Sequence, residues 1–225
     1  MSRRALIKAS GTAAGMALVP SMSEAKSNSL ANTSVAAKQK FEFSLNMSTI
    51  MGQKLGFIKE LEVAAQAGYK HCEIWVPTLE TYLKSGGTIA DARKRIADLG
   101  IKVQNAIGFA QWIVDDESVR AKGIEQLKRE MDLLAQLGCH RTAAPPMGAT
   151  KEAGLDLRRV AERYRTILDL GVSMSVIPQL EMWGHSKNLN RVADVLFVAA
   201  EAGHPAARLL LDVFHIYKGE SSHDC

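Results

Sequence analysis

The sequence AQAGYKHCEIW, residues 65–75, returns in altered form along the chain. Each copy joins the end of a helical pattern to a glycine and then to a short, largely apolar run. The other copies are ADLGIKVQNAI (97–107), AQLGCHRTAAP (135–145), LDLGVSMSVIP (168–178) and AEAGHPAARLLLD (200–212). A glycine just past a helix end adopts the left-handed cap conformation without strain. We therefore interpret each copy as a helix end followed by a strand.

The repeat also has a nearly constant length. Its glycines, Gly68, Gly100, Gly138, Gly171 and Gly203, follow one another at intervals of 32, 38, 33 and 32 residues. Apolar residues before Gly138 and Gly203 recur at three-and-four spacing, which predicts helices there. The expected strands are residues 41–47, 72–76, 103–107, 141–144, 175–180 and 209–213. Because helices separate these runs, we expect parallel strands with both faces covered.

This alternation indicates an α/β fold. A unit of about 32 residues matches the (β/α)8 TIM barrel, in which about 250 residues are divided over eight units. Residues 41–225 are predicted to form an incomplete barrel of this type, with about six strands and five intervening helices. A doubly wound open sheet shares the alternation. However, no G-x-G-x-x-G follows the first expected strand, which argues against a dinucleotide-binding sheet.

The first 40 residues read as a leader and a linker. Residues 1–25 contain the pair Arg3-Arg4, a mildly apolar stretch and a small-x-small cleavage pattern, and so resemble a twin-arginine export signal. Residues 26–40 are expected to be a linker. This interpretation predicts a periplasmic or other extracytoplasmic location, and a disordered basic tail is the alternative. The apolar stretch is too short to span a bilayer, so no stable membrane insertion is expected.

The composition excludes several classes of protein. Hydrophobic residues make up 47% and charged residues 23%, which is typical of a globular domain. The net charge of +4 comes partly from the first eight residues, and no basic stripe suggests nucleic-acid binding. The three cysteines, Cys72, Cys139 and Cys225, are widely spaced and odd in number, so buried thiols are expected rather than a disulfide framework or a zinc ribbon.

Two acidic residues stand at the ends of neighbouring expected strands. Glu181 follows the fifth strand and Asp212 follows the sixth, and chemistry in a barrel collects at the carboxyl ends of its strands. Two carboxylates with a nearby imidazole suit a divalent cation, Mn²⁺ or Mg²⁺ first, with Co²⁺ or Zn²⁺ as alternatives. The competing interpretation is that each carboxylate caps the following helix or pairs with a neighbouring cation.

Further polar and aromatic residues accompany this pair. His215, three residues after Asp212, is expected to bind the metal or a substrate oxygen, or to be structural. His185 and Trp183 lie just after the fifth strand and are candidate substrate-binding residues, while Lys187 is left undecided.

Aromatic residues at the strand ends suggest the wall of a pocket. Trp75, Trp112 and Trp183 lie after different expected strands and could cover the apolar face of a sugar, or they could pack in the core. His71 and His140 begin strands, and we therefore expect them at the opposite end of the barrel.

The fifth-strand sequence QLEMW, the sixth-strand sequence LLLDVFH and the helix-glycine-strand repeat resemble the xylose isomerase-like TIM barrel superfamily over residues 41 to about 220. The resemblance implies a metal held by carboxylate and histidine ligands from the last four strands. It implies that Glu181 is the first ligand and an acid/base group, that Asp212 is the second ligand, and that His215 contacts the substrate.

The activity implied is that of a sugar isomerase or ketose epimerase that moves a proton beside a carbonyl group through an enediolate. Dehydratase or lyase activity on a polyol is a minor variant. A small sugar or polyol is the expected partner, and a homo-oligomer is left open.

Two departures from the superfamily pattern matter. The ligands of the last two strands are not found before residue 225, so this sequence carries half of the ligand set, and we expect weak or no catalysis by it alone. Lys187 also stands near a position where the epimerases often carry a second Glu. A non-catalytic remnant or sugar-binding barrel is therefore the main alternative. An apurinic-site endonuclease is less favoured, because no histidine ends the second or third expected strand.

Overall fold

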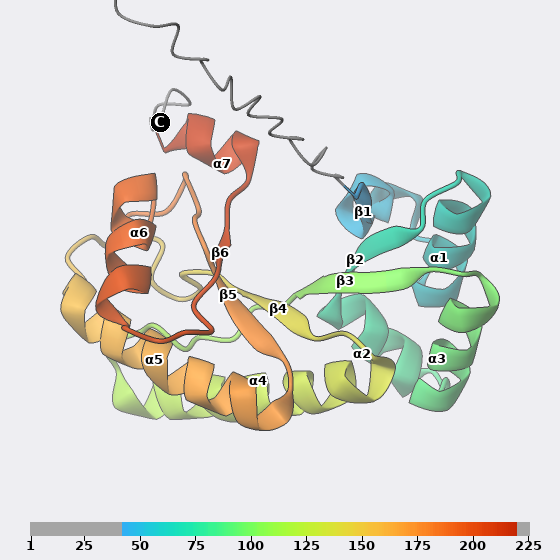
Figure 1. Cartoon of the computed structure of the whole chain (residues 1–225), viewed down its shortest axis with the longest axis horizontal. Coiled ribbons are helices and arrows are strands. Elements are labelled where there is room, and N and C mark those ends of the chain that lie inside the picture. The colour runs from blue at the N-terminus through green and yellow to red at the C-terminus, as the bar shows by residue number, and fades with distance from the viewer. Residues whose placement is uncertain (1–41, 220–225) are drawn as a thin grey trace, which may run out of the picture. The chain divides into compact units, whose positions relative to one another are not determined.

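The structure is a computed structural model, and it describes residues 42–219 (Figure 1). The expected leader, linker and Cys225 lie outside the described residues. Helices and strands alternate along the chain in the expected order. The strands are β1 (Ser44–Asn46), β2 (His71–Trp75), β3 (Lys102–Ile107), β4 (Arg141–Ala144), β5 (Ile177–Glu181) and β6 (Leu209–Leu210). The α-helices are α1 (Phe57–Gln66), α2 (Val76–Lys84), α3 (Ile89–Asp98), α4 (Glu117–Leu137), α5 (Leu157–Met174), α6 (Val192–Glu201) and α7 (Val213–Lys218), and two short 3₁₀ turns, η1 (Met47–Thr49) and η2 (Met51–Gln53), precede α1.

All paired strands are parallel and follow one another in chain order. Strands β1, β2 and β3 form one three-stranded sheet, and β4, β5 and β6 form another. The two sheets meet at β3 and β4, where the Thr142 hydroxyl donates to the Ala106 carbonyl at 3.3 Å. Parallel strands in sequence order, with helices between them, form the wall of a (β/α) barrel. The expected fold class is therefore confirmed, with six strands within residues 42–219.

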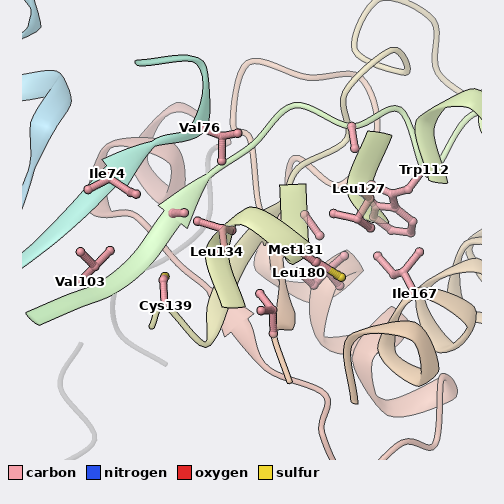
Figure 2. Packing of buried hydrophobic residues seen from close by; sticks show 14 of the residues in the cluster. Ile74, Val76, Val103, Trp112, Leu127, Met131, Leu134, Cys139, Ile167 and Leu180 are labelled. Carbon is pink, nitrogen blue, oxygen red and sulfur yellow. The ribbon is translucent and has the colours of Figure 1, made fainter. Parts of the chain in front are cut away.

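Helices α4, α5 and α6 lie side by side and cover the strands of the second sheet (Figure 1). Helix α4 begins at the N-cap Asp116, whose side chain accepts from the Val119 N–H, and it ends at Gly138 with φ 88°. Its apolar face packs in a continuous core, in which Figure 2 shows Leu127, Met131 and other residues. Burial of this face supplies the main favourable free energy for the layer.

Four of the five glycines of the repeat act as predicted. Gly68, Gly100, Gly138 and Gly203 follow helices with φ of 90°, 62°, 88° and 55°. Gly171 is different, because α5 continues through it to Met174. A Cβ at Gly171 would lie 2.6 Å from the Val176 carbonyl oxygen, so this glycine allows the close approach of α5 to the start of β5.

Several expectations about the strands and helices were wrong in detail. The expected strand 209–213 is only Leu209–Leu210, and Val213 already belongs to α7. The fifth strand begins two residues later than expected and includes Glu181. Two helices, α2 and α3, stand between β2 and β3, where one was expected, because Val76 starts a helix directly after β2 with Pro77 in its first turn.

Other expectations about single residues were confirmed. Cys72 and Cys139 are buried free thiols. His71 and His140 lie at the amino ends of β2 and β4, away from the strand ends that carry the acidic residues. Within the described residues, no helix is both long and apolar enough to cross a membrane.

Candidate functional site

Glu181 is the last residue of β5, and its side chain is buried at the carboxyl end of the sheet. Glu181 is 7% exposed, and its Oε2 atom has no hydrogen-bond partner among residues 42–219. Burial raises the pKa of this carboxyl to about 7, and the negative charges of Glu73 and Asp212 add to this rise against a hydrogen bond with Trp183. A carboxyl group with these properties can exchange a proton near neutral pH.

A row of three polar residues crosses the neighbouring sheet beside Glu181. Asn46, Glu73 and Asn105 are paired with one another in the register of β1, β2 and β3. Asn105 Nδ2 donates to Glu73 Oε1 at 2.7 Å, and Asn46 donates to the other carboxylate oxygen. Burial nevertheless raises the pKa of Glu73, with a further contribution from the charge of Asp212. The row therefore holds a second acidic group at the same end of the barrel.

Asn46, Glu73 and Asn105 were not selected as site residues from the sequence. The available signal was a polar residue at a matching point of three successive apolar strands. The missing information was the register, because Asn46 and Glu73 are 27 residues apart and only strand pairing brings them together.

Asp212 caps helix α7. Its Oδ1 atom accepts from the Phe214 N–H at 2.6 Å and from the His215 N–H at 3.3 Å. The capping interpretation is thus confirmed, although it does not exclude a second role for the other carboxylate oxygen. Glu181 pairs in register with Leu210, so Asp212 follows two residues beyond Glu181's partner on the adjacent strand. Its charge also raises the pKa of Glu181, which places both carboxyl groups at the same end of the sheet.

The predicted substrate-binding residues are brought together. The rings of Trp183 and His185 are stacked with centroids 5.2 Å apart, and His215 lies 5.5 Å from His185. His215 Nδ1 is buried and has no hydrogen-bond partner in the part of the chain that the structure describes, and burial lowers the pKa of this imidazole more than the neighbouring Asp212 raises it. A neutral imidazole with one free nitrogen can accept from or donate to a substrate hydroxyl.

The aromatic wall is longer than the sequence suggested. Phe109 lies between Trp75 and Trp183, with ring centroids 5.2 Å and 6.3 Å away. Trp112, in contrast, is 1% exposed and donates from its indole to the Pro145 carbonyl at 2.9 Å. Trp75 and Trp183 therefore belong to the wall, whereas Trp112 belongs to the core.

Helix α7 is held against the loop after β5 by a glycine contact. A Cβ at Gly184 would lie 2.1 Å from the His215 carbonyl oxygen and 2.5 Å from the Gly219 nitrogen. No side chain fits in this space. Gly184 therefore lets α7 approach closely enough for His215 to reach the rings of Trp183 and His185.

A cavity of about 700 Å³ opens beside these rings, and Trp183, His185 and Asn188 are among its lining residues. Asn188 shapes the opposite loop. Its side-chain amide donates to the carbonyls of Ala149 and Glu152 at 2.6 and 2.7 Å, and its oxygen accepts from two further backbone N–H groups of that loop. The side chain of Lys187, left undecided from the sequence, is exposed, and its backbone N–H donates to the Thr150 carbonyl of this loop at 2.9 Å.

Glu181 and Asp212 were predicted from the sequence to hold a divalent cation. The free oxygen of Glu181 and the carboxylate of Asp212 are hard donors of the kind that Mn²⁺ and Mg²⁺ prefer. Within residues 42–219, however, no three His, Cys, Asp or Glu side chains are grouped to hold an ion. The donors present therefore fit an oxygen-binding divalent cation but form only part of its coordination sphere, and the metal stays a prediction.

Sequence comparison connects this architecture to known proteins. The family description "Xylose isomerase-like TIM barrel" matches residues 61–224. Two similar curated proteins are 3-dehydroshikimate dehydratases. The one from Pseudomonas aeruginosa (strain PAO1) is 28% identical over 166 residues, which cover 70% of this chain and 24% of that protein. The one from Pseudomonas putida (strain KT2440) is 29% identical over 177 residues, which cover 73% of this chain and 26% of that protein. The chain thus spans about a quarter of the length of these relatives.

Solved structures show the same fold. The IolI protein with a bound zinc atom matches with a TM-score of 0.68 at 20% identity, over 81% of this chain and 66% of that one. An L-ribulose 3-epimerase matches with a TM-score of 0.60 at 27% identity, over 71% and 57%. With six parallel strands in chain order and a family match over most of its length, the chain belongs to the xylose isomerase-like TIM barrel family.

Proposed function

We propose that this barrel binds a small sugar or polyol and moves a proton on a carbon beside a carbonyl group, with Glu181 as the acid/base group. The observation that carries the proposal is the carboxyl of Glu181, which is buried at the carboxyl end of β5 with one oxygen unpartnered. A buried carboxyl with a free oxygen is costly for the fold, and such groups are typical of catalytic sites. The names of the similar epimerase and dehydratase structures support this reaction class.

The neighbouring residues have separate roles in this proposal. Trp75, Phe109 and Trp183 bind the apolar face of the sugar, and His215 Nδ1 forms a hydrogen bond with a substrate oxygen. Glu181 takes the proton from carbon, which leaves an enediolate. Delivery of a proton to the other face of that carbon by a second acidic group gives epimerisation, and delivery of the proton to the neighbouring carbon gives isomerisation.

We also propose that Glu181 and Asp212 hold a divalent cation, Mn²⁺ or Mg²⁺ first, together with ligands from outside the described residues. When bound, such an ion supplies a Lewis acid for the carbonyl oxygen. The zinc atom named with the IolI protein, which shares this fold, supports a bound cation.

A second candidate reaction is dehydration. It is favoured by the two curated relatives, which are named as 3-dehydroshikimate dehydratases. Dehydration begins with the same proton abstraction and differs only in its second step, because a hydroxyl on the neighbouring carbon leaves as water. The same carboxyl, Glu181, therefore serves both candidates.

Deuterium exchange tests the proposal directly. The protein is incubated in D₂O with Mn²⁺ and, in turn, D-fructose, L-ribulose and 3-dehydroshikimate, and deuterium at carbon is followed by NMR. We expect slow exchange with one of these compounds, because the described residues carry only part of the ligand set, and we expect loss of that exchange in Glu181→Gln. The control Glu125→Gln changes a carboxylate on α4 that pairs with Lys128 at the surface.

Other outcomes separate the alternatives. Ultraviolet absorbance of a new conjugated product would select dehydration. Saturable binding without exchange would support the sugar-binding barrel instead. Exchange that persists in Glu181→Gln would show that the proposed acid/base residue is wrong.

A further inference from the structure

A second cavity, of about 550 Å³, lies between the start of α1 and helix α2. Four aromatic side chains and one carboxyl group are among its lining residues, and we call it the aromatic cavity. These residues are Phe57, Glu60, Trp75, Tyr82 and Phe109. Its volume is within the range of small-molecule sites in proteins. Neither the proton-transfer proposal nor the metal proposal uses Glu60, Phe57 or Tyr82.

Glu60 is the unusual member of this lining. Its residue is 5% exposed, and it has no side-chain hydrogen bond or ion pair with any described residue. Burial alone raises the pKa of its carboxyl, with no opposing hydrogen bond. The Glu60 carboxylate oxygens are not among the buried side-chain atoms that lack a partner in residues 42–219, so they reach solvent in the cavity. A hydrogen-bond donor of a ligand can replace this water at the carboxylate.

The aromatic rings define what that donor should carry. Phe57 and Tyr82 pack with centroids 5.6 Å apart, and Trp75 and Phe109 pack with centroids 5.2 Å apart. Ring faces carry negative electrostatic potential and attract cations, most strongly when water is excluded. The same rings also bury apolar surface. Two ring pairs around a carboxyl favour a ligand with a positive head and an apolar body.

The other charged residue of the cavity is Lys54, which is exposed and ends the turn η2. Its backbone has φ 52°, the left-handed region that non-glycine residues rarely adopt. No ion pair connects Lys54 with Glu60 among the described contacts, so the lysine does not neutralise this carboxyl. As a solvated cation near the cavity, it weakly disfavours a second positive charge.

We propose that the aromatic cavity binds a small organic ammonium compound, with Glu60 accepting from its N–H groups and the rings enclosing its apolar part. Glu181 is not among the lining residues of this cavity, and the inference does not depend on the proposed proton transfer. It is nevertheless connected to the aromatic wall, because Trp75 and Phe109 belong to both. Trp75 also donates from its indole to Asn46 Oδ1 at 3.1 Å, and Asn46 holds Glu73.

Isothermal titration with phenethylammonium tests this proposal, and 2-phenylethanol serves as the neutral ligand of similar shape. We expect saturable binding of the ammonium compound and binding of the alcohol that is at least about tenfold weaker. The variant Glu60→Gln should reduce ammonium affinity by about tenfold or more, because a charge-assisted hydrogen bond of about 1.5 kcal/mol corresponds to about that factor in Kd.

A second variant, at Lys54, should change the ammonium affinity in the opposite direction. Lys54→Met removes the nearby positive charge, and ammonium binding should become tighter by about twofold to fivefold, an effect that decreases at high salt. Glu125→Gln is the matched control and should leave the affinity unchanged. Thermal melting of Glu60→Gln verifies its folding.

Three results would overturn the proposal. They are the absence of saturable ammonium binding, equal affinity for the alcohol, and full affinity in a folded Glu60→Gln protein. Loss of deuterium exchange at Glu181 would leave the ammonium titration unaffected, so failure of the proposed function and failure of this site can be distinguished.

Discussion

Replacement of Gly184 by alanine should move helix α7 without unfolding the barrel. The new Cβ would lie 2.1 Å from the His215 carbonyl oxygen, whereas ordinary van der Waals contact begins at 3.4 Å. The difference, 3.4 minus 2.1, requires a displacement of about 1.3 Å. Helix α7 gives way most easily, because it has six residues and none of them is buried. Overpacking costs about 1 to 3 kcal/mol, which corresponds to about a 5- to 150-fold increase in local opening.

Hydrogen exchange of single amides measures this opening. The N–H groups of Ile216 and Gly219 donate to Asp212 and His215 within α7, and both should exchange faster by that factor in Gly184→Ala. Amides of β5 should be unchanged. Gly52→Ala is the control, because a Cβ at Gly52 would meet nothing within 4 Å. Unchanged exchange at Ile216 and Gly219 would refute the view that Gly184 positions α7, and with it His215, at the site.

Three further predictions concern stability. Asn188→Asp keeps the two acceptor contacts but loses the two donor contacts to the loop after β4. The free energy of unfolding measured in urea should therefore fall by about 1 to 3 kcal/mol, and an unchanged midpoint would contradict this role of Asn188. Tyr164→Phe removes a buried hydroxyl that donates to the Arg208 carbonyl at 2.8 Å, and a loss of about 1 to 3 kcal/mol should appear as a lower Tm. Burial raises the pKa of the Glu130 carboxyl on α4, because the protonated form is easier to bury than the charged form. This preference favours the folded state fully below pH 4.5, and its contribution to the free energy of unfolding is lost as pH rises through the folded-state pKa. Glu130→Gln should therefore be more stable than the parent at pH 8 by about 1 to 3 kcal/mol and no more stable at pH 4, and equal stability at both pH values would argue that Glu130 is not strained by burial.

The local elements could be predicted from the sequence because their signals are local. The bounds of β4, Arg141–Ala144, are those expected from the apolar run after Gly138. The left-handed glycines after α1, α3, α4 and α6 were found from their place after a helical pattern. In each case the deciding interactions lie within one turn or one strand, so a short window of sequence contains them.

Gly171 and Asp212 show where a local signal was misleading. A glycine near a helix end predicts a cap, but α5 continues through Gly171 because its missing side chain makes room for the start of β5. An acidic residue after an apolar run suggested the end of a strand, but Asp212 begins a helix by accepting from two backbone N–H groups. Both outcomes depend on neighbours that a short window does not contain.

The sequence by itself determined the alternation of helices and strands, the parallel barrel wall, and the places of Glu181 near the end of β5 and Asp212 shortly after β6, because each follows from hydrophobic periodicity and glycine placement. Only the tertiary structure decided which side chains meet. The row of Asn46, Glu73 and Asn105 and the place of Phe109 between two tryptophans both depend on the register of strands and the packing of loops. The physical reason is that these contacts join residues between 27 and 74 positions apart in the sequence, and only the packing of the whole barrel wall fixes their distance.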